Sequence, residues 1–246
     1  MIAIVSPSKT MKEEKVSIRT TKPLFPEDTA LLSKEMRSYD VQGLENLMKI
    51  SEDLAILNYE RFQNFEKAST YPALYLFKGD VFKGLDVDTL EKEEVSYLSK
   101  HLRILSGLYG LLRPLDAMKP YRLEMGTKHA NARGKDLYTF WGDKIRQQLE
   151  KDAKDEILVN LASQEYAKAA RLEETSLQVV HIEFREKKNG KYPIVAFYAK
   201  VARGEMARFM AKNNVQTIEE LKSFDYSDYA FNEDLSTENT LVFTRG

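Results

Sequence analysis

The chain has 246 residues, of which 43% are hydrophobic and 11% aromatic, so it can bury a sizeable core as one large domain or two. Its formal net charge is −1, and this balance does not by itself indicate a nucleic-acid-binding protein. The absence of cysteine excludes disulfides, thiolate nucleophiles, cysteine-ligated metals and cysteine-based peroxide chemistry, and it is typical of a reducing compartment.

The N-terminal segment predicts a buried strand and a polar loop. Residues 2–5 are apolar, and the loop SPSKT at 6–10 follows them. Lys9 in that loop is a candidate anion contact at a strand end, although the glycines of a phosphate-binding loop are missing and a plain surface lysine is the alternative. The apolar run is too short for a signal peptide and no stretch is long enough to span a membrane, so we expect a cytoplasmic protein.

Helical patterns follow at about 27–39, 41–49 and 52–65. Ser51 is placed to cap the third helix, with Glu52 and Asp53 in its first turn. Two short helices joined tightly resemble the helix-hairpin-helix that grips a nucleic-acid backbone, so such an element is one interpretation of residues 41–65. The turn lacks the usual glycine, which makes the pattern unspecific.

The 52–65 helix has polar groups on its predicted buried face. Leu54, Leu57 and Phe62 mark that face, and Asn58 and Arg61 share it by helical periodicity. Such groups need partners. Either they form a buried hydrogen-bonded pair that fixes packing, or Arg61 reaches a functional site.

A glycine-bounded acid comes next. Residues 73–77 predict a strand, and Asp80 follows it between Gly79 and Gly84. An acid at a strand end is in a usual position for a functional residue, but Asp80 is equally suited to cap a turn. An amphipathic helix is then predicted over 90–100.

The stretch RILSGLYGLLRPLDAMKPYRLEMG, residues 103–126, is rich in arginine, glycine and proline. A short helix is predicted from Gly107 to Arg113, because Pro114 disfavours helical backbone before it. Residues 121–125 alternate as a strand, which places Arg122 and Glu124 on one face. These two side chains form either an ion pair or a cation and a carboxylate addressing one ligand.

Charge is distributed unevenly along the chain. Residues 100–146 contain ten lysines and arginines against four acids, whereas residues 213–246 contain two against seven. Positive charge therefore gathers around the unusual central stretch, which suits an anionic partner. The alternative is a scatter of solvated lysines.

The C-terminal half predicts further strands and a basic helix. A strand over 156–161 ends near Ser163 and Glu165, the same kind of position as the 6–10 loop, so the two strand ends should converge. A hairpin is expected from 177–186 and 192–199, around an Asn-Gly turn. The helix at 198–213 carries Lys200, Arg203 and Arg208 on one arc, with Gly204 among them. Trp141 is expected in the core, and 240–244 is expected as an edge strand.

The motifs SPSKT, FKGDVFKGL, LSGLYGLLRPLDAMKPYRLEMG, LYTFWG, VNLASQEY and YAKVARG, in this order, resemble the bacterial YaaA family of peroxide stress resistance proteins. The resemblance covers nearly the whole chain. It implies one compact α/β domain over 1–246, with a mixed sheet flanked by helices, a basic cleft and an unusual fold. By match to the family's motifs, the site residues are Lys9, Arg61, Asp80, Arg103, Arg113, Arg122, Glu124, Lys200, Arg203 and Arg208.

The same resemblance implies a cytoplasmic protein that acts in the peroxide response, limits free iron and binds DNA. A direct peroxidase is not expected, because cysteine is absent and His101, His129 and His181 are widely separated. We therefore weigh a protein that binds duplex or branched DNA, with no cofactor and no metal site, against an enzyme for a phosphorylated or nucleobase-like substrate. In the enzyme, Glu124, Asp80 or Glu165 would be the acid or base. Direct iron sequestration is a third hypothesis.

Overall fold

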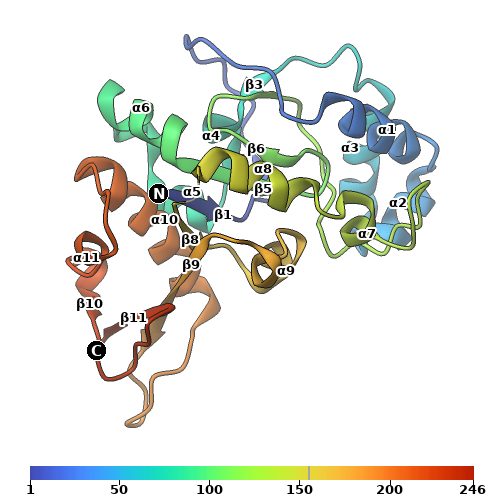
Figure 1. The fold of residues 1–246 in the computed structure, drawn as a ribbon. Helices are drawn as coiled ribbons and strands as arrows, with labels where there is room; N and C mark the ends of the chain where they lie inside the picture. The colour runs from blue at the N-terminus through green and yellow to red at the C-terminus, as the bar shows by residue number, and fades with distance from the viewer. Residues whose placement is uncertain (155) are drawn as a thin grey trace.

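A computed structural model describes residues 1–154 and 156–246, and Figure 1 shows their arrangement. Helices and strands mix throughout, which confirms the predicted α/β class. The first strand lies where the sequence predicts it, and all four of its residues are buried. The strands are β1 (Ile2–Val5), β2 (Thr10–Met11), β3 (Tyr71–Pro72), β4 (Phe77–Lys78), β5 (Leu102–Ser106), β6 (Gly110–Leu112), β7 (Ala117–Met118), β8 (Ile157–Leu161), β9 (Gln178–Glu186), β10 (Ala230–Phe231) and β11 (Thr240–Arg245).

Several helices begin at residues whose side chains cap the free backbone N–H groups. Asp40 accepts from the N–H of Gly43, and Asp136 accepts from that of Thr139. The α-helices are α1 (Pro26–Arg37), α2 (Val41–Met48), α3 (Glu52–Gln63), α4 (Ala73–Leu76), α5 (Asp80–Leu85), α6 (Lys92–His101), α7 (Leu137–Trp141), α8 (Lys144–Ala153), α9 (Gln164–Ala169), α10 (Ala196–Lys212) and α11 (Ile218–Leu221); the 3₁₀ turns are η1 (Val87–Thr89), η2 (Leu172–Glu174) and η3 (Tyr226–Asp228).

A seven-stranded mixed sheet in the order β10-β11-β9-β8-β1-β5-β6 forms the centre. The five strands from β11 to β5 are parallel to their neighbours, and the edge strands β10 and β6 are antiparallel. The long helix α10 packs on α5, α6 and β9, and α8 packs on β1. Helices α1, α2, α3 and α7 gather on the side of the molecule remote from the C-terminus (Figure 1). No helix within the described residues is both long and apolar enough to cross a membrane.

The predicted helix from Gly107 to Arg113 is wrong, because this segment turns β5 back into β6 as a tight hairpin. Gly110 has a φ of 68°, which a left-handed turn position requires and a helix does not allow. A Cβ atom at Gly107 would lie 2.2 Å from the carbonyl oxygen of Leu123. The glycines therefore serve a turn and a close backbone crossing. Trp141 fills the space beside this turn and is buried, as predicted, and its Nε1 donates to the carbonyl of Gly107 at 3.0 Å.

Two other predicted strands are also wrong. Residues 73–76 form the single turn α4 after Pro72, and only 77–78 are extended. A short buried apolar run fits either structure, which explains the error. Residues 192–199 do not return as a hairpin strand, because α10 begins at Ala196 and β9 pairs with β8 and β11 instead. The Asn189-Gly190 turn is present, with positive φ at both residues.

The C-terminal strand and the buried face of α3 also differ from expectation. Strand β11 lies between β9 and β10, so it is not at the edge of the sheet. In α3, Leu54 and Leu57 are 38% and 40% exposed, whereas Ala55, Asn58 and Phe62 are buried. The helix is thus rotated relative to the predicted face. Asn58 Nδ2 donates to the carbonyl of Leu54 within the same helix, whereas its buried Oδ1 has no hydrogen-bond partner among the described residues.

Candidate functional site

A polar pocket of about 450 Å³ lies where the chain leaves β1 and β8. The loop after β1, the start of α5, the segment 121–124, the start of α9 and the middle of α10 surround it. Ligands of open α/β sheets bind outside the carboxyl ends of the strands, so this is the expected place for a site. Seven of the sequence-predicted residues line the polar pocket: Lys9, Asp80, Arg122, Glu124, Glu165, Lys200 and Arg203.

The two strand ends converge as the sequence predicts. The neighbouring parallel strands β1 and β8 bring Ser6 and Ser163 together, and the backbone N–H of Ser163 donates to Ser6 Oγ at 2.9 Å. Both serines line the polar pocket. Neither serine is among the predicted site residues, although each follows a strand that the sequence predicts.

Asp80 is brought to the polar pocket by a close contact with the loop after β1. Ser8 donates a hydrogen bond to the carbonyl of Lys78, and a Cβ atom at Gly79 would lie 2.3 Å from Ser8 Oγ. The glycine also has a φ of 154°, which other residues rarely adopt. The backbone conformation and the close contact at position 79 therefore both require glycine. Asp80, the next residue, lies in the first turn of α5.

The segment 121–124 alternates as predicted, although it does not form a regular strand. Tyr121 and Leu123 are buried, and Tyr121 shares a hydrogen bond of 2.6 Å with Ser106. Burial raises the pKa of the Tyr121 phenol well above its ordinary value, so this residue is a neutral wall of the polar pocket. Arg122 and Glu124 project to the opposite side.

Glu124 joins two cations from separate parts of the chain. Its carboxylate lies 2.7 Å from Lys9 Nζ and 3.2 Å from an Arg122 guanidinium nitrogen. Arg122 is only 15% exposed, and its Nε atom is buried without a hydrogen-bond partner among the described residues. A buried guanidinium N–H that lacks a partner is costly.

Glu165 is held at the opposite wall by the backbone. The N–H of Gly126 donates to its Oε1 at 2.8 Å, and a Cβ atom at Gly126 would lie 3.2 Å from the same oxygen. The neighbouring Tyr166 phenol accepts from the N–H of Met125, and burial raises its pKa well above the ordinary value. The end of the segment 103–126 is thus fixed against α9.

Lys200 and Arg203 come from successive turns of α10. Neither has a hydrogen bond or an ion pair within the described part of the chain. Burial lowers the pKa of Arg203, with Glu183 acting in the opposite direction, and even a lowered arginine pKa leaves the group charged at neutral pH. These are cations held at a cavity without a carboxylate partner. With Lys9 and Arg122 they outnumber the acids Asp80, Glu124 and Glu165, so the polar pocket is weakly positive.

Two arginines of the central stretch lie outside the polar pocket because acids inside the fold bind them. Arg103 Nε is 2.5 Å from Asp152, and its guanidinium also donates to the carbonyl of Leu102. Arg113 pairs with the fully buried Asp116 at 2.9 Å and donates to the carbonyl of Lys22. Both ion pairs join parts of the fold, and neither arginine lines the polar pocket.

Arg61 and Arg208 also lie apart from the polar pocket. Arg61 pairs with Glu13 at 2.9 Å, and Arg208 donates to the carbonyls of Leu85 and Asp86 at the end of α5. The predicted contact face of α10 is therefore divided. Its Lys200 end faces the polar pocket, and its Arg208 end closes the C-terminus of α5.

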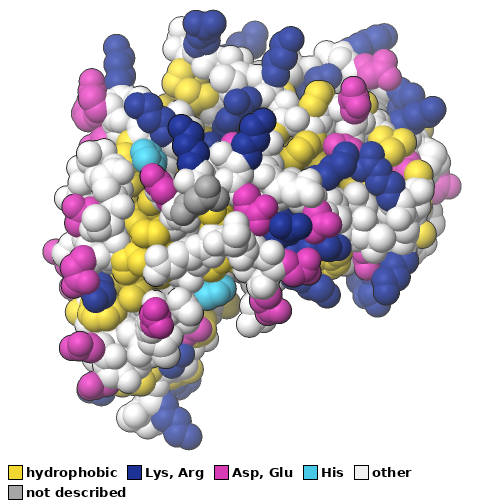
Figure 2. Space-filling model, viewed as in Figure 1, with side chains coloured by type: hydrophobic (Ala, Val, Ile, Leu, Met, Phe, Trp, Pro, Cys, Tyr) yellow, Lys and Arg dark blue, Asp and Glu magenta, His cyan; other side chains and the backbone are white. Residues whose placement is uncertain are grey.

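The tandem helices α2 and α3 form a tight pair whose link passes through the left-handed Lys49. No residue of 41–65 lines the polar pocket, and the pair carries more acids than cations. Figure 2 shows lysine and arginine side chains spread over the upper and right-hand parts of this face, with acidic side chains among them and along the left-hand edge. Among the described residues, no group of three or more His, Asp or Glu side chains is arranged to hold a metal ion.

Comparison with known proteins gives matches over the whole chain. A family model described as peroxide stress protein YaaA matches residues 1–235. Relatives named UPF0246 protein occur in Saccharophagus degradans, 46% identical over 254 residues, and in Aliivibrio fischeri, 48% identical over 255 residues. These alignments cover 100% of this chain and 99% and 98% of the respective relatives. A relative in Alteromonas mediterranea is 46% identical over 254 residues.

Proposed function

We propose that this chain, which belongs to the YaaA family of peroxide stress proteins, protects DNA in the cytoplasm by binding it at the polar pocket. The family membership gives the chain a general role in peroxide stress. The DNA contact, the cytoplasmic location and a lowering of free iron are the proposed parts. Since the sequence has no cysteine to reduce peroxide, protection would act on the target of the damage or on the supply of iron.

The observation that carries the proposal is a pair of cations on α10 that have no partner among the described residues. Lys200 and Arg203 lie within one turn of each other and line a concave surface. Cations at such a surface bind phosphate groups and release counterions from nucleic acid. Arg122, whose side chain is 15% exposed, adds a further cation to the lining. A phosphate of a DNA strand would bind between these side chains.

A fluorescence anisotropy titration of duplex and four-way-junction DNA tests this proposal. Between about 50 and 200 mM salt, neutralising two to three phosphates predicts a fall in affinity of roughly ten- to fortyfold. Binding that ignores salt, or no binding at low salt, contradicts the proposal. Comparing the two DNA forms shows which one the protein prefers.

A second function is favoured by the three carboxylates in the same polar pocket. Binding of a DNA backbone does not require Asp80, Glu124 and Glu165 around the cations. An enzyme for a phosphorylated or nucleobase-like substrate would use the cations as an anion clamp and one carboxylate as general acid or base. Glu124 is the first choice because two cations hold it in place.

The substitution Glu124→Gln separates the two functions. Loss of this negative charge frees Lys9 and Arg122, so a DNA-binding protein should keep or gain affinity. An enzyme should lose turnover while its ligand still binds. The matched control is Glu219→Gln, since Glu219 is an exposed acid paired with Lys222 away from the polar pocket.

A further inference from the structure

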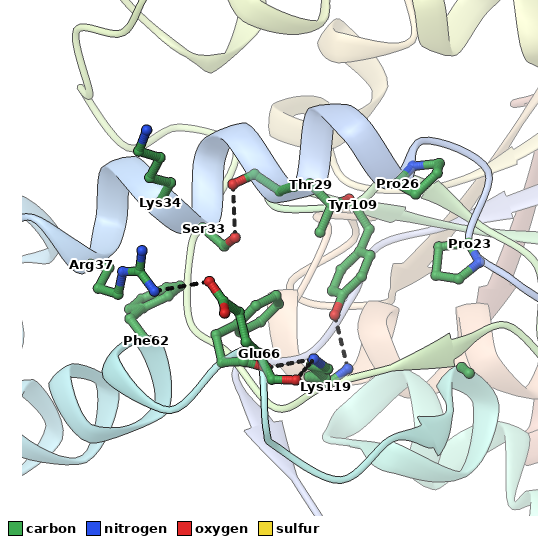
Figure 3. A pocket seen from close by; sticks show the side chains of 13 residues that line it. Pro23, Pro26, Thr29, Ser33, Lys34, Arg37, Phe62, Glu66, Tyr109 and Lys119 are labelled. Carbon is green, nitrogen blue, oxygen red and sulfur yellow. Dashed lines mark hydrogen bonds and ion pairs between the residues drawn. The ribbon is translucent and has the colours of Figure 1, made fainter.

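A second cavity, separate from the polar pocket, lies between α1 and the end of α3. Its volume is about 470 Å³, within the range of small-molecule sites. Figure 3 shows its walls, which come from segments far apart in the sequence. Pro23, Pro26, Phe62, Phe65 and Tyr109 give it mostly apolar and aromatic walls. We call it the aromatic cavity.

Part of the wall contributed by α1 consists of small side chains, and the hydroxyl donors among them are already used. Thr29 Oγ1 donates to the carbonyl of Phe25 at 2.9 Å, and Ser33 Oγ donates to that of Ala30 at 3.0 Å. Ala30 itself is exposed toward the opening. The small side chains therefore leave room for a flat ring, and neither hydroxyl hydrogen is free to bond to it.

Tyr109 supplies a buried hydroxyl group to the aromatic cavity. The residue is 3% exposed, and its hydroxyl accepts the backbone N–H of Lys119 at 2.8 Å. The hydroxyl hydrogen has no acceptor among the residues that the structure describes. Burial raises the pKa of this phenol well above its ordinary value, so the hydrogen stays in place at neutral pH. An unsatisfied buried donor calls for an acceptor atom on a ligand.

Lys119 brings a positive charge to the same end of the aromatic cavity (Figure 3). Its ammonium group donates to the carbonyls of Phe65 and Glu66 at 2.5 and 2.9 Å and lies 5.1 Å from the Phe65 ring centroid. Neither of these partners is a carboxylate, so the charge is oriented but not neutralised. The nearby Glu66 carboxylate is instead paired with Arg37 at 3.0 Å. The polar end thus combines a neutral donor with an uncompensated cation.

We propose that the aromatic cavity binds a small planar aromatic carboxylate. The ring would lie between the aromatic and proline walls, where flat rings gain both burial and favourable ring contacts. The carboxylate would accept from the Tyr109 hydroxyl and lie beside the Lys119 ammonium group. This site is independent of the proposed DNA contact, because Lys200 and Arg203 do not line it.

Isothermal titration calorimetry with 2-naphthoate tests the proposal on the full chain. We expect saturable 1:1 binding, weakened roughly 10- to 150-fold by Tyr109→Phe, which removes one hydrogen bond to a charged acceptor. Ala30→Trp should abolish binding, because the indole fills the opening without removing a core contact. Lys151→Gln is the matched control and should leave the affinity unchanged, since Lys151 is an exposed lysine of α8 that does not line the cavity.

One further variant and one further ligand test whether 2-naphthoate binds at the aromatic cavity and whether the ring is recognised. Arg203→Gln should leave the affinity for 2-naphthoate unchanged. Weaker binding by this variant would place the ligand in the polar pocket and overturn the proposal. Decanoate binding more tightly than 2-naphthoate would overturn the aromatic class. Equal affinity in wild type, Tyr109→Phe and Ala30→Trp, or no saturable binding of 2-naphthoate, would overturn the site. Thermal unfolding of each variant confirms that it is folded before its affinity is compared.

Discussion

Gly204 of α10 lies against Val81 of α5 so closely that a Cβ atom at position 204 would be 1.8 Å from the Val81 carbonyl oxygen. The contact is reciprocal, because a Cβ atom at Gly84 would be 2.1 Å from the carbonyl oxygen of Val201. The two helices therefore cross backbone to backbone. This crossing brings Lys200 and Arg203 to the polar pocket beside Asp80.

The substitution Gly204→Ala should destabilise the protein, although alanine favours helix by about 1 kcal/mol. The added methyl group meets backbone, which cannot move aside as a flexible side chain can, so we expect a cost of about 3 kcal/mol or more. Urea unfolding followed by circular dichroism measures it. Lys200→Gln on the same helix should change stability by less than about 0.5 kcal/mol. Equal stability of Gly204→Ala and wild type would refute the close crossing.

Arg113 should matter for folding and not for ligand binding. Its guanidinium lies 2.9 Å from the fully buried Asp116, which also accepts from Thr21 Oγ1 at 2.6 Å. Arg113→Gln leaves that carboxylate without its charged partner, and we expect a loss of about 1–3 kcal/mol in the free energy of unfolding. DNA affinity, measured well below the midpoint of unfolding, should stay unchanged. A large loss of affinity would return Arg113 to the binding site.

Asp136 makes a pH-dependent contribution at the start of α7. The Thr139 N–H and hydroxyl both donate to it at 2.8 Å, and these hydrogen bonds hold its pKa below the ordinary value of 3.8. A lowered folded-state pKa stabilises the protein above the ordinary value, and the stabilisation is lost as the pH falls through the folded-state pKa. Asp136→Ala should cost about 1 kcal/mol at neutral pH.

Urea unfolding at a series of pH values checks this sign. The difference between wild type and Asp136→Ala should shrink as the pH falls below 3.8. Glu219→Gln serves as the control, because its exposed carboxylate is not a helix cap. A difference that grows in acid would show that the Asp136 carboxylate does not act through its ionised form.

Much of the fold was predictable because strong local patterns agree with the final packing. The apolar run of β1 is buried, and the alternation over 121–125 places Arg122 and Glu124 on the polar side even without a regular strand. The sequence-based predictions failed where one residue pattern is compatible with two local structures. The glycines at 107 and 110 suit a smooth helix face or a hairpin turn, and only the backbone at Leu123 and the positive φ decide between them.

The polar pocket was predictable in part, for a physical reason. Residues directly after parallel strands meet at one edge, so Lys9 and Glu165 could be placed together from the sequence. Whether a cation faces a ligand or an internal acid depends on partners far along the chain. Arg103 forms an ion pair with Asp152, and Arg61 forms one with Glu13. No local sequence pattern indicates either pair. The aromatic cavity arises from several separate segments and has no motif of its own.

The salt dependence of DNA affinity in matched variants tests the role of the polar pocket most directly. The double variant Lys200→Gln/Arg203→Gln should lower the slope of log affinity against log salt by about 2, or roughly 1 for each lost phosphate contact. Arg113→Gln should leave the slope as in wild type. An unchanged slope in the double variant, with a reduced slope in Arg113→Gln, would place the DNA elsewhere on the protein and contradict the proposed function.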